Sequence, residues 1–245
     1  MFKKLERTSK QVGGLLAGDA VYSAQEERGL TTLFLGRAGT FVEVGAYDPV
    51  FQSQTLHLEM MGWRGLLVEP VPELANNLRA SRQADVAQVA CVAPEAAGIG
   101  RVALLERRGN STIVFNPSKI GPEDAVLDVP AATLDAVLEG AGLSRIDYIS
   151  VDVEGAEPEV LRGLTLKRFR PKLVVVDDRE RFGETRAVMR SGGYCLVRRT
   201  GHNAWFVPLA VARHLSWQAW AQLVWTYSFG RFFRRRLRSG LARTA

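Results

Sequence analysis

The chain has 245 residues, of which 47% are hydrophobic and 24% are charged. This is the composition of an ordinary globular protein, and it excludes an intrinsically disordered or fibrous chain. At this length the chain can form one large α/β domain, with or without a small appendage.

The two cysteines and the N-terminal sequence indicate a cytoplasmic protein. Cys91 and Cys195 lie far apart in apolar, strand-like runs, a pattern typical of reduced, buried thiols and not of a disulfide framework. The first residues, MFKKLERTSKQ, lack the apolar run that follows the basic residues of a secretory signal. We therefore expect the protein to stay in the cytoplasm.

The net charge of +6 is distributed unevenly along the chain. Glu184 is the last acidic residue, and eleven arginines follow between residues 185 and 245. Residues 1–184 carry 21 basic and 26 acidic side chains, a net charge of −5. A strongly basic tail on an acidic body indicates an anionic partner for the tail, either a membrane surface or nucleic acid.

The organising stretch of the sequence is TFVEVGAYD, at residues 40–48. Its apolar start predicts a strand, and Gly45 and Ala46 predict a tight turn directly after it. A second apolar run, Leu66 to Val68, is followed directly by Glu69, which lies 24 residues after Gly45. An acid at the end of the second strand of a βαβ unit suits the two hydroxyls of a ribose.

The turn after the first strand lacks the further glycines of a dinucleotide-binding loop, since Gly45 is followed by Ala46, Tyr47 and Asp48. This argues against NAD and FAD and favours a nucleoside without a pyrophosphate, such as S-adenosylmethionine. Glu43 and Asp48 beside the turn would attract its cationic groups. The alternative is that both acids are ordinary polar residues at a strand end.

The remaining pattern alternates strands with helices. Helices are expected at 53–61, 72–82, 132–140 (with Thr133 as a cap), 158–163 and 185–190, and strands at 66–68, 86–92, 147–153, 172–178, 194–198 and 204–207. Residues 100–129 predict a hairpin insertion, with a loop at 116–128, that shapes the substrate pocket. Such alternation predicts a mostly parallel sheet with helices on both faces and a ligand site at the carboxyl ends of its strands.

Several segments resemble the successive motifs of the FkbM-type methyltransferases. They are YSAQEE, FVEVGAYDPVFQSQT, GWRGLLVEPVPEL, TLDAVL and DYISVDVEGAEPEVLRGL, and they run from residue 22 to residue 208. The resemblance implies a Rossmann-like class I methyltransferase fold, with a mostly parallel seven-stranded sheet and helices on both faces. It does not cover the C-terminal tail, and the residue pattern adds to this fold the small β insertion and a C-terminal amphipathic helical tail. The resemblance also implies S-adenosylmethionine as cofactor and O-methyl transfer to sugar or natural-product hydroxyls.

Site residues follow from the resemblance position by position. Glu43, Gly45 and Tyr47 would line the methionine end of the cofactor, Glu69 would hold the ribose, and Cys91 and Val92 would lie beside the adenine. The full expected cofactor set is Glu43, Gly45, Ala46, Tyr47, Asp48, Glu69, Pro70, Cys91, Val92 and Asp152. Two departures from the family are Pro49, where many members have glycine, and His202, where a related subgroup has an acid shortly before the tryptophan.

A metal site is a further expectation. Asp152, Asp177 and Asp178 are similar to the carboxylates that hold magnesium in catechol O-methyltransferase, and hard oxygen ligands suit Mg²⁺. The lysine base of those enzymes would fall on Gly155. We therefore expect Asp152, Glu154 or His202 to act in catalysis, with two alternatives: His202 is a surface histidine, or Asp152 contacts cofactor or substrate without a metal.

The tail combines several tryptophans with a basic end, RRRLR. Its apolar residues keep helical spacing but are too interrupted for a spanning helix. An amphipathic interfacial helix on an anionic membrane is one reading, and packing on the domain itself or in a homodimer is the other; nucleic acid binding is less favoured. The expected organisation is an N-terminal helical segment (1–30), a cofactor-binding domain (31–207) and the tail (208–245).

Together these features predict an O-methyltransferase acting on a sugar, glycolipid or natural product, either free or lipid-linked at the inner face of the membrane. The alternatives are an RNA methyltransferase that uses the basic tail, and a non-catalytic cofactor-binding module recruited by the tail.

Overall fold

A computed structural model describes residues 31, 35, 38–106, 111–113, 125–179, 181–200 and 202–212. The predicted helical segment at 1–30, most of the predicted loop at 116–128 and the tail beyond residue 212 lie outside these residues. The boundaries between the three predicted parts of the chain therefore stay predictions.

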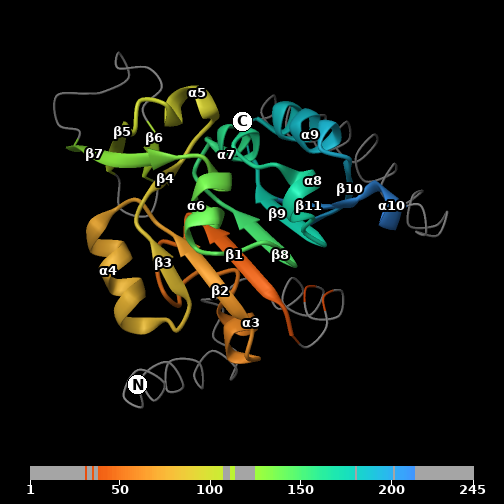
Figure 1. The fold of residues 1–245 in the computed structure, drawn as a ribbon, viewed down its shortest axis with the longest axis horizontal. Coiled ribbons are helices and arrows are strands. Elements are labelled where there is room, and N and C mark those ends of the chain that lie inside the picture. The colour runs from red at the N-terminus through yellow and green to blue at the C-terminus, as the bar shows by residue number, and fades with distance from the viewer. Residues whose placement is uncertain are drawn as a thin grey trace, which may run out of the picture.

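A seven-stranded sheet forms the centre of the described chain (Figure 1). Its order is β10-β11-β9-β8-β1-β2-β3, and its strands are β1 Thr40–Val44, β2 Arg64–Val68, β3 Asp85–Ala87, β8 Tyr148–Val151, β9 Leu173–Asp177, β10 Tyr194–Thr200 and β11 Asn203–Pro208. Five neighbouring strands of this sheet, β9, β8, β1, β2 and β3, are parallel. Strand β11 runs antiparallel to its neighbours β9 and β10. The strand order changes direction at β1, where β2 lies on one side and β8 on the other.

The central strands are apolar on both sides because helices cover both faces of the sheet. On one face, Val42, Ile149 and Val174 pack with residues of α6 (Leu134–Gly140), α7 (Glu157–Arg162), α8 (Leu166–Phe169) and α9 (Phe182–Ser191). On the other face, Phe41 and Tyr148 pack with residues of α3 (Leu56–Met60), α4 (Pro72–Ser81) and α10 (Leu209–Ala212). The predicted two-faced layering is confirmed.

Local signals explain several element boundaries. Pro72 begins α4, where its missing N–H costs no helical hydrogen bond. The side chain of Thr133 accepts a hydrogen bond from Ala136 N, so it caps α6 as the sequence predicted. Gly65 lies opposite Phe41 in the sheet, and a Cβ at this glycine would lie 2.0 Å from the Phe41 ring. The sheet therefore needs glycine at position 65.

A second sheet differs from the sequence prediction. Its order is β4-β7-β5-β6, with β4 Ala90–Cys91, β5 Arg101–Glu106, β6 Thr112–Ile113 and β7 Ala125–Ala132; the short helix α5 Pro94–Ala97 precedes β5. The single strand predicted at 86–92 is wrong, because β3 pairs with β2 whereas β4 pairs with β7. The hairpin is confirmed, but 125–128 is strand and not loop. Asp128 and Pro130 lower the strand propensity there, and pairing with β5 overrides it.

Within the described ranges, no helix is long and apolar enough to cross a membrane.

Candidate active site

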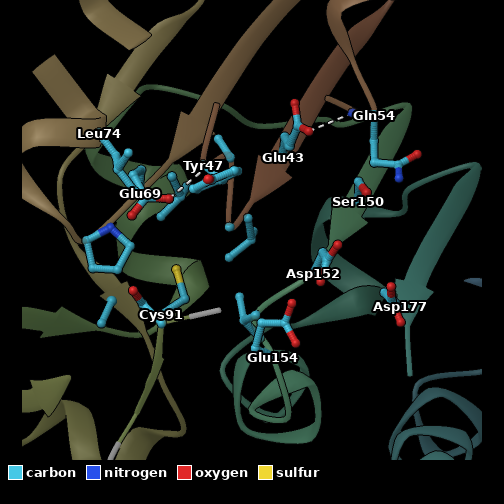
Figure 2. A pocket seen from close by; sticks show the side chains of 18 of the residues that line it. Glu43, Tyr47, Gln54, Glu69, Leu74, Cys91, Ser150, Asp152, Glu154 and Asp177 are labelled. Atoms are coloured by element: carbon cyan, nitrogen blue, oxygen red, sulfur yellow. Dashed lines mark hydrogen bonds between the residues drawn. The ribbon is translucent and has the colours of Figure 1, made fainter. Parts of the chain in front are cut away.

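A cavity of about 440 Å³ opens at the carboxyl ends of β1, β2, β8 and β9 (Figure 2). This is the edge of the sheet where parallel α/β proteins bind ligands, beside the strand at which the order changes direction. Its volume lies within the range of sites for small molecules. The structure thus has a pocket where the strand pattern predicted a ligand.

The two ends of the pocket differ in chemistry. Apolar side chains from α4, the β3–β4 connection and the second sheet form one end, namely Leu74, Val89, Ala90, Cys91, Leu104 and Ile113. Figure 2 shows Leu74 and Cys91 on the side of Glu69, and Asp152 and Asp177 across the pocket from them. The pocket therefore offers an apolar slot at one end and carboxylates at the other.

Glu69 follows β2 and is 4% exposed. Its Oε2 accepts a hydrogen bond from Tyr47 N at 2.9 Å, and its Oε1 accepts one from Val71 N at 3.0 Å. Burial raises the pKa of Glu69, and these two backbone donors oppose that shift. The carboxylate is held firmly at the pocket wall, with lone pairs left on both oxygens.

Glu43, at the pocket end of β1, is used differently from the sequence expectation. Its Oε1 accepts from Gln54 N at 2.7 Å, and its Oε2 accepts from Ser53 Oγ at 3.2 Å and from Thr55 Oγ1. Figure 2 shows the carboxylate turned towards Gln54. Burial raises the pKa of Glu43, while the charge of Arg82 and these donors lower it. Glu43 lines the pocket, but its charge is directed at the loop after β1.

Asp152 follows β8 and lies among other acids. Burial first, and then the charges of Asp177, Glu154 and Glu157, raise its pKa to about 8. Asp177 is paired with Arg179, the basic residue among the described lining residues, at 3.2 Å. No described residue donates a hydrogen bond to the side chain of Asp152. This carboxyl is therefore suited to exchange a proton near neutral pH.

Four predicted site residues do not line the pocket: Asp48, Val92, His202 and Asp178, the last of which belongs to the predicted metal site. Asp48 turns its carboxylate back to accept from Val50 N and Phe51 N, which fixes the loop. Val92 is fully buried and packs among the apolar residues of the second sheet. His202 is exposed in the turn between β10 and β11 and is not among the lining residues, which favours the surface alternative over the predicted catalytic role.

The predicted metal trio does not assemble. Asp177 and Asp178 are consecutive at the end of β9, so their side chains point to opposite faces of the sheet. Asp177 faces the pocket, whereas Asp178 is fully buried and its Oδ1 accepts from Arg181 N at 3.0 Å. Over the described ranges, no three His, Cys, Asp or Glu side chains are arranged to hold a metal ion. The structure therefore does not support the predicted magnesium site on Asp152, Asp177 and Asp178.

The other predicted residues come together, and the structure adds several more. Gly45, Ala46, Tyr47, Pro70 and Glu154 all line the pocket. The sequence prediction missed Phe51, Gln52, Gln54, Leu74, Leu104, Ser111, Ile113, Ser150 and Arg179. Gln52 and Gln54 follow the small-residue turn and Arg179 follows a strand end, so their positions were a usable signal. Leu104 and Ile113 come from a hairpin whose packing the sequence did not determine.

Comparison of the sequence with known protein families gives a match, which covers the strand ends that form the pocket. The family model described as the methyltransferase FkbM domain matches residues 43–196, which run from the end of β1 through β2 to β9 and into the start of β10. The chain belongs to the FkbM methyltransferase family. The resemblance found in the sequence and the Rossmann-like class I methyltransferase fold predicted from it are both confirmed. Comparison with curated proteins gives no match.

Several solved methyltransferase structures are similar to this FkbM-family chain. A TehB-like SAM-dependent methyltransferase from Corynebacterium glutamicum is 12% identical over 84% of this chain and 98% of its own, with a TM-score of 0.42. A precorrin-6y C5,15-methyltransferase from Geobacter metallireducens is 11% identical over 78% and 90%, with a TM-score of 0.39. The 1,6-didemethyltoxoflavin-N1-methyltransferase of Burkholderia thailandensis, solved with 1,6-didemethyltoxoflavin and S-adenosylhomocysteine, is 11% identical over 83% and 84%, with a TM-score of 0.38.

Proposed function

We propose that this FkbM-family protein is an S-adenosylmethionine-dependent O-methyltransferase that acts on a hydroxyl of a sugar, glycolipid or natural product. The observation that carries the proposal is the Glu69 carboxylate, fixed by Tyr47 N and Val71 N at the end of β2 in a pocket of suitable size. Family membership supports the methyl-transfer chemistry.

The pocket fits a nucleoside in three respects. Each oxygen of Glu69 accepts one backbone hydrogen bond and can accept another, so the carboxylate can receive both ribose hydroxyls. Leu74, Ala90 and Cys91 form an apolar slot beside it that would take the adenine. The acidic end, with Asp152 and Glu154, would attract a cationic sulfonium and amino group.

When bound, S-adenosylmethionine would supply an electrophilic methyl group on its sulfonium. The protein must then orient the acceptor oxygen in line with that methyl group and remove the hydroxyl proton. Asp152 is the residue best suited to accept the proton, because it faces the pocket and its raised pKa makes it a stronger base than an ordinary aspartate. Transfer of the methyl group to the oxygen would leave the carbon–sulfur bond pair on sulfur, and Asp152 would hold the proton of the hydroxyl.

Calorimetric titration with S-adenosylhomocysteine tests the cofactor site. Wild type should bind, and Glu69→Gln should bind about ten-fold more weakly or worse, since an amide both accepts and donates and cannot receive two hydroxyls equally well. Glu73→Gln is the matched control, because Glu73 is exposed on α4 close to Glu69 in the chain. No binding by folded wild type would refute the proposal.

O-methylation is tested with labelled S-adenosylmethionine and a panel of sugars, glycolipids and polyols. Incorporated methyl should be stable to base, as an ether is, and its position should be read by mass spectrometry. Label found on nitrogen or carbon would contradict O-specificity while leaving the cofactor site intact. Turnover on RNA, lost at raised salt, would favour the RNA methyltransferase alternative.

We also propose that the basic tail binds an anionic membrane and brings the domain to lipid-linked acceptors at the inner leaflet. Support comes from sequence alone: residues 208–245 hold seven arginines and no acidic residue, with several tryptophans and with apolar residues at helical spacing. Full-length protein should sediment with anionic vesicles and lose this binding as salt is raised, whereas neutral vesicles should not bind it. Equal binding to both vesicle types would refute the electrostatic anchor.

A further inference from the structure

The loop between β1 and α3 forms one wall of the pocket, to which it contributes Tyr47, Phe51, Gln52 and Gln54. Behind this loop lies Arg82, which directly follows the last residue of α4. The side chain of Arg82 is fully buried. Arginine is almost never buried in this way unless its guanidinium is fully paired, so its partners show what holds it there.

The guanidinium of Arg82 divides its hydrogen bonds between the loop and α3. Its Nε donates to Glu59 Oε2 at 3.0 Å, which is the ion pair. Its Nη1 donates to Pro49 O at 3.3 Å and to Ser53 Oγ at 3.0 Å. Its Nη2 donates to Thr55 Oγ1 at 3.0 Å. Three of the four acceptors thus belong to the loop after β1.

The two hydroxyls connect Arg82 to Glu43 on the other side of the loop. Ser53 Oγ and Thr55 Oγ1 each accept from Arg82 and each donate to Glu43 Oε2. A hydroxyl has one hydrogen, so accepting from the guanidinium leaves that hydrogen for the carboxylate. Gln54 N donates to Glu43 Oε1 as well. The loop is therefore clamped between a buried cation and a buried anion.

We propose that Arg82 is a positioning residue that, through Pro49, Ser53 and Thr55, holds this loop in the conformation that receives the nucleoside cofactor. The inference rests on the proposed function for its ligand. Arg82 lies behind the wall and is not among the described residues that line the cavity. Its effect is preorganisation, because a loop already ordered in the free protein does not have to be ordered by the ligand.

Removing Arg82 breaks a buried ion pair and destabilises the protein, but Glu59 keeps other donors that limit this effect. Glu59 also accepts from Gln83 N at 2.7 Å and from Ala84 N at 3.3 Å, so this carboxylate keeps two donors without Arg82. Met in place of Arg82 would fill the apolar part of the site. The loop, in contrast, would lose all three of its contacts with the guanidinium.

Two variants test the proposal from different sides. Arg82→Met removes the cation. Thr55→Val removes one of the two connecting hydroxyls and keeps the shape of the side chain. The Thr55 side chain makes no capping hydrogen bond to α3, so this change does not uncap the helix. Both variants should weaken S-adenosylhomocysteine binding about ten-fold or more in calorimetry. Arg82→Lys should recover part of the affinity, since one ammonium cannot replace the guanidinium fork. Hydrogen exchange of the ligand-free protein should show faster exchange at residues 50–56 in Arg82→Met.

Two controls separate positioning from general destabilisation. Arg79→Met changes an exposed arginine one turn earlier on α4, which contacts Asn76 and Gln88, and should bind like wild type. Phe169→Leu weakens the core beneath α8 and should lower stability without changing affinity. Wild-type affinity in folded Arg82→Met, with unchanged exchange at 50–56, would overturn the proposal. A wild type that fails to bind would refute the proposed function, and the exchange of the loop would still decide whether Arg82 holds it.

Discussion

A Cβ atom on Gly45 would lie 1.8 Å from the carbonyl oxygen of Asp152. The two residues follow neighbouring strands, β1 and β8, and Asp152 N donates to Val44 O at 3.0 Å. Gly45 N meanwhile donates to Val68 O at 2.9 Å, on the strand at the other side. One residue without a side chain therefore lets the ends of β1, β2 and β8 meet, and this brings the carboxylates of Glu69 and Asp152 into one pocket.

Gly45→Ala should destabilise the protein and abolish cofactor binding. The backbone of Gly45 has φ +83°, which alone costs a residue with a Cβ about 1–3 kcal/mol, and the clash with Asp152 would force the strand ends apart. Thermal unfolding should show a fall of several degrees or more. Gly140→Ala is the control, because a Cβ there meets no atom within 4 Å, and it should unfold and bind like wild type.

The pH dependence of the reaction should follow Asp152. Only the ionised carboxylate can accept a proton, and its pKa is raised to about 8, so kcat/KM should rise with pH and level off above that value. A bound sulfonium would favour the ionised form, so the kcat profile should lie at lower pH. Asp152→Asn should lower kcat about a hundred-fold or more and remove the pH dependence. A pH profile that Asp152→Asn leaves unchanged would exclude Asp152 as the base.

The same carboxyl, Asp152, should make the stability of the protein fall as pH rises, whereas kcat/KM rises. Its pKa is raised in the folded state, so between its unfolded pKa near 3.8 and about 8 the folded protein holds a proton that the unfolded chain releases. The free energy of unfolding therefore falls as pH rises through this window, by at most about 1.4 kcal/mol per pH unit. Asp152→Asn should unfold at a higher temperature than wild type at pH 8. Asp85→Asn, an exposed change at the start of β3, should show no such gain.

His202→Ala should leave methyl transfer within about two-fold of wild type, since an exposed side chain outside the pocket can contribute neither proton transfer nor binding. Steady-state kinetics with any acceptor that the enzyme accepts would measure this. A large fall in kcat with unchanged stability would mean that the turn between β10 and β11 reaches the acceptor in the working enzyme.

Magnesium should affect neither stability nor turnover, because Asp178 points away from Asp152 and Asp177. Thermal unfolding in EDTA and in millimolar Mg²⁺ should coincide, and so should turnover. Asp178→Asn should lower stability, since the change weakens the acceptor of Arg181 N, but should not create a dependence on metal. Turnover that EDTA removes and Mg²⁺ restores would return the metal to the mechanism.

Much of the site could be predicted from the sequence because parallel strands carry their ligands at one edge. Gly45 after the first strand, Glu69 after the second and Asp152 after β8 each stand directly behind an apolar run. Such positions need only strand ends and their order, which the alternating pattern supplies. The cap at Thr133 was predictable for a similar reason, since it depends on neighbours within one turn.

The sequence did not show which face of the sheet a side chain points to, or which strands pair with each other. Asp177 and Asp178 are adjacent acids in the sequence, and only the register of β9 decides that one faces the pocket while the other is buried. The strand predicted at 86–92 divides between two sheets because β7, more than thirty residues later, offers β4 a partner.

The sequence by itself determined the family, the alternation of strands and helices along the chain and the acids that follow the strands, because these depend on local periodicity and on motifs of fixed spacing. Only the tertiary structure decided how Glu43 is used. Its partners Ser53, Gln54 and Thr55 are near in sequence, but the cation that completes the arrangement is Arg82, from the end of another helix. A buried charge takes whichever partners the packed chain brings to it, and that choice is made by the fold as a whole.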